Sequence, residues 1–131
     1  CKQHPTVLGL FSRRFLPNWL KPDWLMRYDR WYIMAEQNYQ EVFEAPYLSG
    51  CCMMIRSEAF RRVGGFDERY FLYLEDADIT RSLAREGRCV HLPVASVVHG
   101  WGRGNYRNLG LVAVNLISAF HYFRKWGWKF W

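Results

Sequence analysis

Apolar residues gather in three stretches of the chain, and their spacing differs from one stretch to the next. Residues 47–55 form a mostly apolar run around Gly50, which predicts a strand buried on both faces. Residues 89–98 are also apolar but are interrupted by Pro93, so they predict one or two further strands. Within residues 109–120, apolar positions recur at helical intervals and predict one apolar helix face. That face consists of Leu109, Val112, Ala113, Leu116, Ile117 and Phe120.

Two shorter helices are predicted between the two apolar runs. Ser57 favours a helix N-cap, and Gly64 and Gly65 favour a stop after Val63. The second helix opens with an acidic cluster, because carboxylates are stabilised at helix N-termini, and it ends at Gly87. The cluster comprises Glu75, Asp76 and Asp78, and the apolar face of this helix comprises Ile79, Leu83 and Ala84. The order strand, helix, helix, strand predicts a mixed α/β domain.

The remaining segments flank this central region of residues 47–100. Residues 1–46 contain four prolines and scattered large aromatic residues, which predict loops and short helices in a covering segment. Residues 101–131 contain a glycine turn followed by the helical pattern and a basic, aromatic tail. The chain therefore divides into a covering segment, a central α/β part and a C-terminal amphipathic helix.

Composition narrows the class of protein. The chain has 131 residues, is 50% hydrophobic and 18% aromatic, and carries 18 basic against 12 acidic side chains. These values exclude a disordered chain, a collagen and a disulfide-rich miniprotein. Nearly all of the excess positive charge lies in residues 101–131, which hold five basic residues, no acidic residue and nine aromatic residues. No uncharged run reaches the length of a membrane span.

The cysteines and the first residue raise separate questions. The four cysteines lack the spacing of a zinc site or a redox pair, so reduced, buried thiols are expected. Because the sequence starts at Cys1 without a signal peptide, we expect it to be a piece of a longer protein. Lipidation of Cys1 is the alternative interpretation of that residue.

Three groups of residues are candidates for chemistry. A carboxylate of the acidic cluster could accept a proton from a substrate hydroxyl, although the cluster would also serve simply as helix N-terminal chemistry. His99 ends an apolar stretch beside a glycine turn, where α/β folds place ligand sites, and a structural histidine is the alternative. The tail from Arg124 to Trp131 could bind a membrane surface, single-stranded nucleic acid or a protein partner.

Several motifs agree in order and spacing with one known family. Residues 47–100 contain SGCCMMIR, GGFDER, FLYLEDAD and VVHG, and they closely resemble the C-terminal half of family 2 glycosyltransferases of the GT-A fold. The likeness is greatest to the bacterial rhamnosyltransferases that build O-antigen and related surface polysaccharides. Residues 108–127 resemble the closing helix of that branch.

The resemblance implies roles for individual residues. Asp76 would be the general base that deprotonates the acceptor hydroxyl, and the transfer would invert the anomeric configuration. Glu75, Gly50 and Trp101 would contact substrate, and His99 would help to bind metal. A divalent cation, Mg²⁺ or Mn²⁺, would stabilise the leaving diphosphate and would be held mainly by an N-terminal half that this sequence lacks.

The resemblance also implies partners and a location. The donor would be a nucleoside-diphosphate sugar similar to dTDP-rhamnose, and the acceptor a lipid-linked glycan. The protein would lie peripherally at the cytoplasmic face of the cell membrane, on anionic lipid, with no nucleic-acid partner. This piece alone would be inactive, and an uncovered sheet edge would favour self-association. The rival interpretation is a non-catalytic module whose basic aromatic tail binds membrane or nucleic acid.

Overall fold

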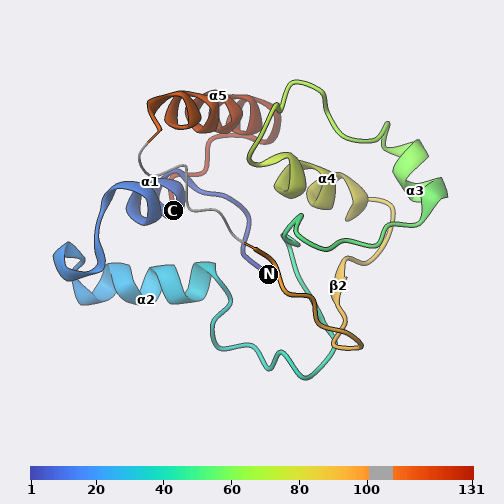
Figure 1. The fold of residues 1–131 in the computed structure, drawn as a ribbon, viewed down its shortest axis with the longest axis horizontal. Coiled ribbons are helices and arrows are strands. Elements are labelled where there is room, and N and C mark those ends of the chain that lie inside the picture. Colours follow the sequence, from blue (N-terminus) through green and yellow to red (C-terminus); the bar gives the residue numbers. More distant parts are fainter. Residues whose placement is uncertain (101–107) are drawn as a thin grey trace.

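The computed structural model describes residues 1–100 and 108–131. Helices are the main regular structure of these residues, and the sheet within them has two short strands (Figure 1). The elements in chain order are α1 (Val7–Phe15), η1 (Asn18–Leu20), α2 (Asp23–Tyr32), β1 (Phe43–Glu44), α3 (Ser57–Arg62), α4 (Glu75–Leu83), β2 (Val90–His91) and α5 (Leu109–Trp126). None of the described helices is long and apolar enough to cross a bilayer.

Helices α1 and α2 pack against each other as a hairpin joined by η1. Gly9 permits the close approach, because a Cβ at this position would lie 3.1 Å from the ring of Tyr32. Ser12 Oγ donates a 2.8 Å hydrogen bond to Asp29 Oδ1 across the interface. Pro17 and Pro22 immediately precede η1 and α2, where proline's fixed φ suits the start of a helix. Local sequence signals therefore determine where this hairpin turns.

The end of the chain completes the first turn of α1. The backbone N–H groups of Val7 and Leu8 donate to the carbonyl oxygens of Lys129 and Phe130, at 2.9 and 3.0 Å. Thr6 caps the next free group by accepting from Gly9 N–H. The first N–H groups of a helix have no partner within that helix, so the tail provides acceptors that α1 needs. The N-terminal helix and the tail consequently lie side by side (Figure 1).

The main core lies between α4 and α5. It contains buried residues from the loop after β1, from the loop before α4, from α4 itself and from α5: Tyr47, Tyr70, Leu74, Ala77, Tyr122 and Phe123. Val7 and Leu10 of α1 pack against its edge. In Figure 1, α5 runs across the top of the molecule beside α1 and α4. This core fixes the start of α4 relative to α1, which matters for the site below.

The strand predicted for residues 47–55 is wrong. Tyr47 forms an isolated antiparallel bridge with Lys2, and the rest of the run is irregular. Cys51 and Cys52 are exposed, and Met54 is 99% exposed, so the two cysteines are not the buried thiols predicted. A strand requires neighbouring backbone groups for its ladder, and no described segment pairs along this run. The apolar composition of residues 47–55 is therefore not sufficient for a strand.

The second predicted strand is largely wrong as well. Within residues 89–98, the strand is confined to β2, which pairs antiparallel with β1 in the register Phe43 to His91 and Glu44 to Val90. Val94, Val97 and Val98 beyond Pro93 are exposed. The predicted order of strand, helix, helix, strand is therefore not observed. What the described residues contain is a mixture of helices with one small antiparallel sheet.

The helix predictions fare better. Helix α3 starts at Ser57 and is followed by Gly64 and Gly65 with φ of 80° and 75°, although Arg56 rather than Ser57 occupies the cap position. Helix α4 opens on the predicted acidic cluster. Its residues Ile79 and Leu83 are buried as predicted, whereas Ala84 is exposed.

Helix α5 also forms where the periodicity predicts it, but its predicted apolar face is not the side that packs. Leu109, Leu116, Ile117 and Phe120 are exposed, and Leu109 is 85% exposed. The buried positions are Ser118, Tyr122 and Phe123. Tyr122 and Phe123, rather than the predicted apolar face, pack into the core. The spacing of the apolar residues therefore predicts the helix but not which of its sides is buried.

Candidate functional site

A strained turn places the acidic cluster at the start of α4. Tyr73 and Leu74 have φ of 70° and 64°, in the left-handed region that side chains other than glycine rarely adopt. Leu74 is buried in the core, which offsets this backbone cost. The turn ends directly before Glu75, so it sets the directions in which Glu75 and Asp76 leave the helix.

Asp76 is held by three hydrogen bonds from the protein. Oδ1 accepts from Tyr47 Oη at 2.8 Å and from Ala77 N–H at 2.9 Å. Oδ2 accepts from Gly50 N–H at 2.9 Å, and within the described residues this is its one recorded hydrogen bond. A carboxylate oxygen has two lone pairs, so Oδ2 keeps an acceptor position for another donor. The side chain is thus fixed in orientation and still able to accept.

Gly50 is required at this position for steric reasons. A Cβ built there would lie 3.1 Å from Asp76 Cβ and 3.4 Å from Asp76 Oδ2. Contacts this short force the neighbouring group to move, so a side chain at residue 50 would displace the carboxylate. The glycine that the sequence analysis assigned to substrate binding therefore also positions Asp76.

Glu75 lies in a different environment although it adjoins Asp76. Its side chain is half-buried, and Oε2 is buried with no hydrogen-bond partner among the described residues. Burial raises the pKa of Glu75, and the neighbouring charge of Asp76 raises that pKa further. Glu75 thus keeps its proton to a higher pH than an exposed glutamate does, and its buried Oε2 lacks a partner among the described residues.

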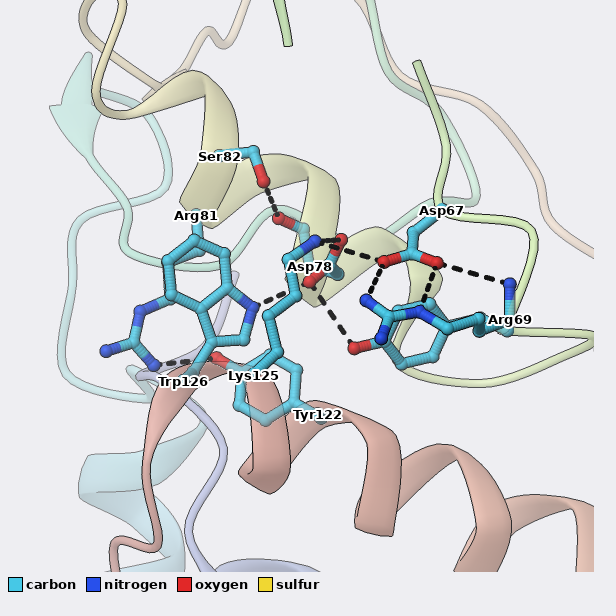
Figure 2. A network of polar contacts seen from close by, with 9 residues as sticks. Asp67, Arg69, Asp78, Arg81, Ser82, Tyr122, Lys125 and Trp126 are labelled. Carbon is cyan, nitrogen blue, oxygen red and sulfur yellow. Dashed lines mark hydrogen bonds and ion pairs between the residues drawn. The ribbon is translucent and has the colours of Figure 1, made fainter. Parts of the chain in front are cut away.

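Asp78 points toward Lys125 and Trp126 of α5 and has a structural role (Figure 2). It is 3% exposed, and its Oδ1 accepts from Trp126 Nε1 at 2.6 Å. Its Oδ2 accepts from Lys125 Nζ at 2.7 Å, and the same Nζ lies 3.2 Å from Asp67 Oδ2. These contacts tie α4 to the end of α5. Asp76 and Asp78 therefore do not converge on one ligand despite the spelling Asp-Ala-Asp.

Glu75 and Asp76 line a cleft of about 650 Å³. Gly50 and His99 line the same cleft, so the structure brings together four of the five residues that the sequence analysis selected. The fifth, Trp101, lies outside the described residues. The roles of these residues stay predictions. Their common location is what the structure adds.

A cationic wall, formed by residues that the sequence motifs did not indicate, also lines the cleft. Arg13 and Arg14 of α1 are among them, together with Lys2. The motifs of residues 47–100 contain no signal for this part of the cleft, because α1 ends more than 30 residues before they begin. The cleft thus combines carboxylates from α4 with cations from the N-terminal segment.

A chain of polar contacts links this cationic wall to Asp76. Lys2 Nζ lies 3.5 Å from Tyr47 Oη, which in turn donates to Asp76 Oδ1. Burial lowers the pKa of Lys2, although the charge of Asp76 opposes that shift. Burial raises the pKa of Tyr47 well above its usual value, and the hydrogen bond to Asp76 adds to this effect. Tyr47 therefore remains a neutral donor to the carboxylate.

The described residues alone do not make up a metal site. Among residues 1–100 and 108–131, no group of three or more His, Cys, Asp or Glu side chains is placed to hold a metal ion. Glu75, Asp76 and His99 share the cleft but not a common coordination centre. The divalent metal and the role of His99 in binding it therefore stay predictions.

The basic aromatic tail is partly used inside the molecule. Lys125 and Trp126 bind the buried Asp78, and the guanidinium of Arg81 lies 4.6 Å from the Trp126 ring centroid. Trp128, Phe130 and Trp131 remain exposed. Only the last part of the tail is thus free to contact a surface.

Comparison with known families places the acidic cluster within a matched region of the chain. A family model described as the N-terminal domain of galactosyltransferase matches residues 30–102, which is more than half of the chain and contains the acidic cluster. The chain therefore belongs to this glycosyltransferase family. No solved structure matches it.

Curated relatives refine this class to a rhamnosyltransferase-like protein of the family 2 type. The chain is 41% identical over 86 residues to the N-acetylglucosaminyl-diphospho-decaprenol L-rhamnosyltransferase of Mycobacterium tuberculosis, covering 63% of this chain and 26% of that protein. It is 37% identical over 54 residues to rhamnosyltransferase WbbL of Escherichia coli, covering 40% of this chain and 20% of that protein. The chain thus spans about a quarter or less of the length of these relatives.

Proposed function

We propose that this chain forms the acceptor-binding, base-bearing part of an inverting GT-A glycosyltransferase that transfers rhamnose. The observation that carries this proposal is the Asp76 carboxylate, which lies on the cleft wall in a fixed orientation with an acceptor position left on Oδ2. A general base requires such an acceptor within hydrogen-bond reach of a substrate hydroxyl. The family match and the rhamnosyltransferase relatives support the reaction class.

In the proposed reaction, Asp76 Oδ2 takes the proton of the acceptor hydroxyl. The hydroxyl oxygen forms a bond to the anomeric carbon of the donor sugar. The bond from that carbon to the diphosphate oxygen breaks on the opposite side, and its electron pair leaves with the nucleoside diphosphate. One displacement of this kind inverts the anomeric configuration.

The other cleft residues have supporting roles in this proposal. Tyr47 and Gly50 hold the carboxylate of Asp76 so that Oδ2 faces the cleft. Glu75 lines the cleft beside Asp76 and has a raised pKa, so its side chain is placed to contact the acceptor sugar. A divalent cation would neutralise charge on the leaving diphosphate, and its ligands would come mainly from residues outside this chain.

The acceptor in this proposal is a lipid-linked glycan. The mycobacterial relative is named for N-acetylglucosaminyl-diphospho-decaprenol, a sugar joined through diphosphate to a long lipid. An acceptor of this class resides in a membrane, so the protein would work peripherally at the cytoplasmic membrane face. Its donor would be dTDP-rhamnose or a close analogue, in the synthesis of a bacterial surface polysaccharide.

The decisive experiment is Asp76→Asn in the complete gene product. Loss of a general base costs about 10²- to 10⁴-fold in rate, so transfer of rhamnose from dTDP-rhamnose should fall by at least about 100-fold. Affinity for the dTDP-rhamnose donor, measured by calorimetry, should stay nearly unchanged. Loss of donor binding instead would assign Asp76 to the nucleotide or metal site and contradict its role as base.

A matched variant, Asp67→Asn, separates a specific effect from a general one. Asp67 is also a carboxylate on a loop near α5, but it pairs with Arg69 and Lys125 and does not line the cleft. Its replacement should leave the transfer rate within about threefold of the unmodified protein. A loss as large as that of Asp76→Asn would remove the argument for a unique base.

A further inference from the structure

The hairpin of residues 7–33, which comprises α1, η1 and α2, exposes an unusual number of large apolar side chains. Gly9 and Ser12 of α1 and Leu25 and Tyr32 of α2 are buried. The exposed large apolar side chains of the hairpin are Phe11, Phe15, Trp19, Leu20, Trp24, Met26, Trp31 and Ile33. Aromatic residues dominate this set, and three of them are tryptophans. Exposed apolar surface of this extent marks an interaction surface.

The most exposed part is the tip of the hairpin. Phe15, Trp19, Leu20 and Trp24 fall within ten residues that contain the turn, and Trp19 is 81% exposed. Figure 1 shows this tip at the left edge of the molecule, away from β2 and α3. A projecting tip of this composition can enter a surface without moving the rest of the fold.

On the outer surface of the hairpin, almost all of the charged side chains are positive. Residues 7–33 contain five basic and two acidic side chains. Asp29 is half-buried and is neutralised by Lys21, which leaves Asp23 as the exposed acid. Arg13, Arg27 and Arg30 are exposed. A second cavity of about 440 Å³ within the hairpin is lined by Arg13, Arg30 and the paired Lys21 and Asp29 among others, so its net charge is positive and favours an anionic headgroup.

The composition of this surface fits a lipid interface better than it fits the interior of a protein. Tryptophan and arginine together are typical of the boundary between lipid headgroups and acyl chains. The exposed face of α5 provides a contrast, because residues 108–123 contain no Asp, Glu, Lys or Arg and the face is mainly aliphatic. That face has the composition of a surface buried against protein.

The hairpin also adjoins the cleft and the exposed end of the tail. Leu10 and Arg13 of α1 line the cleft together with Asp76. The tail residues Lys129 and Phe130 accept hydrogen bonds from the first turn of α1. A membrane under the hairpin would therefore lie next to the cleft.

We infer that the hairpin of residues 7–33 is a membrane-binding surface that inserts Trp19 and Trp24 at an anionic lipid interface and so delivers the cleft to an acceptor held in that membrane. The inference rests on the proposed function for the nature of the acceptor. The binding itself depends on lipid alone. Anionic headgroups contact the arginines, and the aromatic tip occupies the boundary region.

The test is flotation of the complete gene product with vesicles of phosphatidylcholine, with and without phosphatidylglycerol. Replacing Trp19 and Trp24 by serine should reduce binding to vesicles containing phosphatidylglycerol by more than about tenfold, because each buried aromatic side chain contributes to partitioning. Arg27→Gln with Arg30→Gln should weaken binding about fivefold for each arginine and only where phosphatidylglycerol is present.

Two controls keep the inference open to contradiction. Met54→Ser with Val98→Ser removes fully exposed apolar side chains outside the hairpin and should leave flotation unchanged. Trp131→Ser tests the tail alone. If only the tail variant abolishes binding, or if the tip variants lower the unfolding temperature without changing flotation, the hairpin is not the membrane surface and the tip is covered by protein.

Activity on a water-soluble acceptor separates this inference from the proposed function. The tip variants should transfer to a short-chain acceptor analogue at the same rate as the unmodified protein and should lose rate only with the membrane-held acceptor. Absence of transfer by the unmodified protein would contradict the proposed function, whereas flotation would still decide the membrane surface.

Discussion

Asp76 and Asp78 are two carboxylates on the same turn of α4, yet they have opposite surroundings. Asp76 receives two backbone N–H groups and a tyrosine hydroxyl and lines a cleft. Asp78 is buried and receives Lys125 and Trp126 of α5. Residues two apart on a helix point in nearly opposite directions, so one short motif serves both a site and a core. The carboxylates of the acidic cluster therefore have different surroundings, and the role of each follows from its own contacts.

The sharpest way to break this comparison is the same substitution at both positions. Asp78→Asn keeps an oxygen for Trp126 but sets an amide against the Lys125 ammonium, and losing this charged hydrogen bond at the buried Asp78 should cost about 2 kcal/mol. Asp76→Asn keeps the bonds to Tyr47 and Ala77 and loses the acceptor of Gly50, at a cost of about 1 kcal/mol. Urea unfolding measures both values, and equal losses would contradict the division of roles.

Gly50→Ala tests how strongly the transfer rate depends on the position of the Asp76 carboxylate. The new Cβ would lie 3.1 Å from Asp76 Cβ, so the carboxylate must shift. A misplaced catalytic group costs up to about 100-fold, and we expect transfer to fall by between about 10- and 100-fold. Gly87→Ala is the matched control, because a Cβ there meets nothing within 4 Å. Similar rates for the two variants would show that the cleft tolerates movement of Asp76.

Trp126→Phe sharpens the structural side of the comparison. It removes the indole donor to Asp78 at 2.6 Å while keeping most of the aromatic surface. Loss of a hydrogen bond to a charged group should cost about 1.5 kcal/mol in the free energy of unfolding. Trp128→Phe is the control, since Trp128 stacks on Phe123 and makes no recorded bond to Asp78. If both variants lose the same stability, the bond to Asp78 contributes nothing measurable.

The smallest expected effect concerns Glu75 and pH. Because burial raises its pKa in the folded state, the folded protein binds more protons than the unfolded chain between the ordinary pKa and the raised one. The contribution of Glu75 to stability therefore falls as pH rises through that window. Glu75→Gln should gain stability relative to the unmodified protein as pH increases from 4 to 7. Unfolding midpoints that differ by the same amount at every pH would contradict this prediction.

Sequence patterns located α3, α4 and α5 because the signals for these helices are local. Glycines after residue 63, carboxylates at the start of α4 and the periodicity of residues 109–120 each act within a turn or two of the chain. The strands failed because a strand depends on a partner elsewhere, and residues 47–55 have no described partner along their length. The prediction of which side of α5 packs was wrong for a similar reason, because the packing of Tyr122 and Phe123 depends on core residues from other parts of the chain.

Some residues of the candidate site could likewise be predicted from local motifs, and others could not. The acidic cluster, Gly50 and His99 belong to motifs within residues 47–100, and the structure places them on one cleft. The cationic wall from α1 could not be predicted, because no local pattern connects Arg13 to residues more than 60 positions later. The opposite directions of Asp76 and Asp78 could have been predicted from the helical repeat alone.

The hydrogen bonds from Val7 and Leu8 to Lys129 and Phe130 have a consequence for the order in which this part of the protein forms. During synthesis, the first helix emerges more than 120 residues before the carbonyl groups that complete it. The side of the cleft that α1 lines thus stays incomplete until Lys129 and Phe130 have been synthesised. We therefore expect α1, and with it this side of the cleft, to reach its final form late in folding, after residues 129 and 130 are in place.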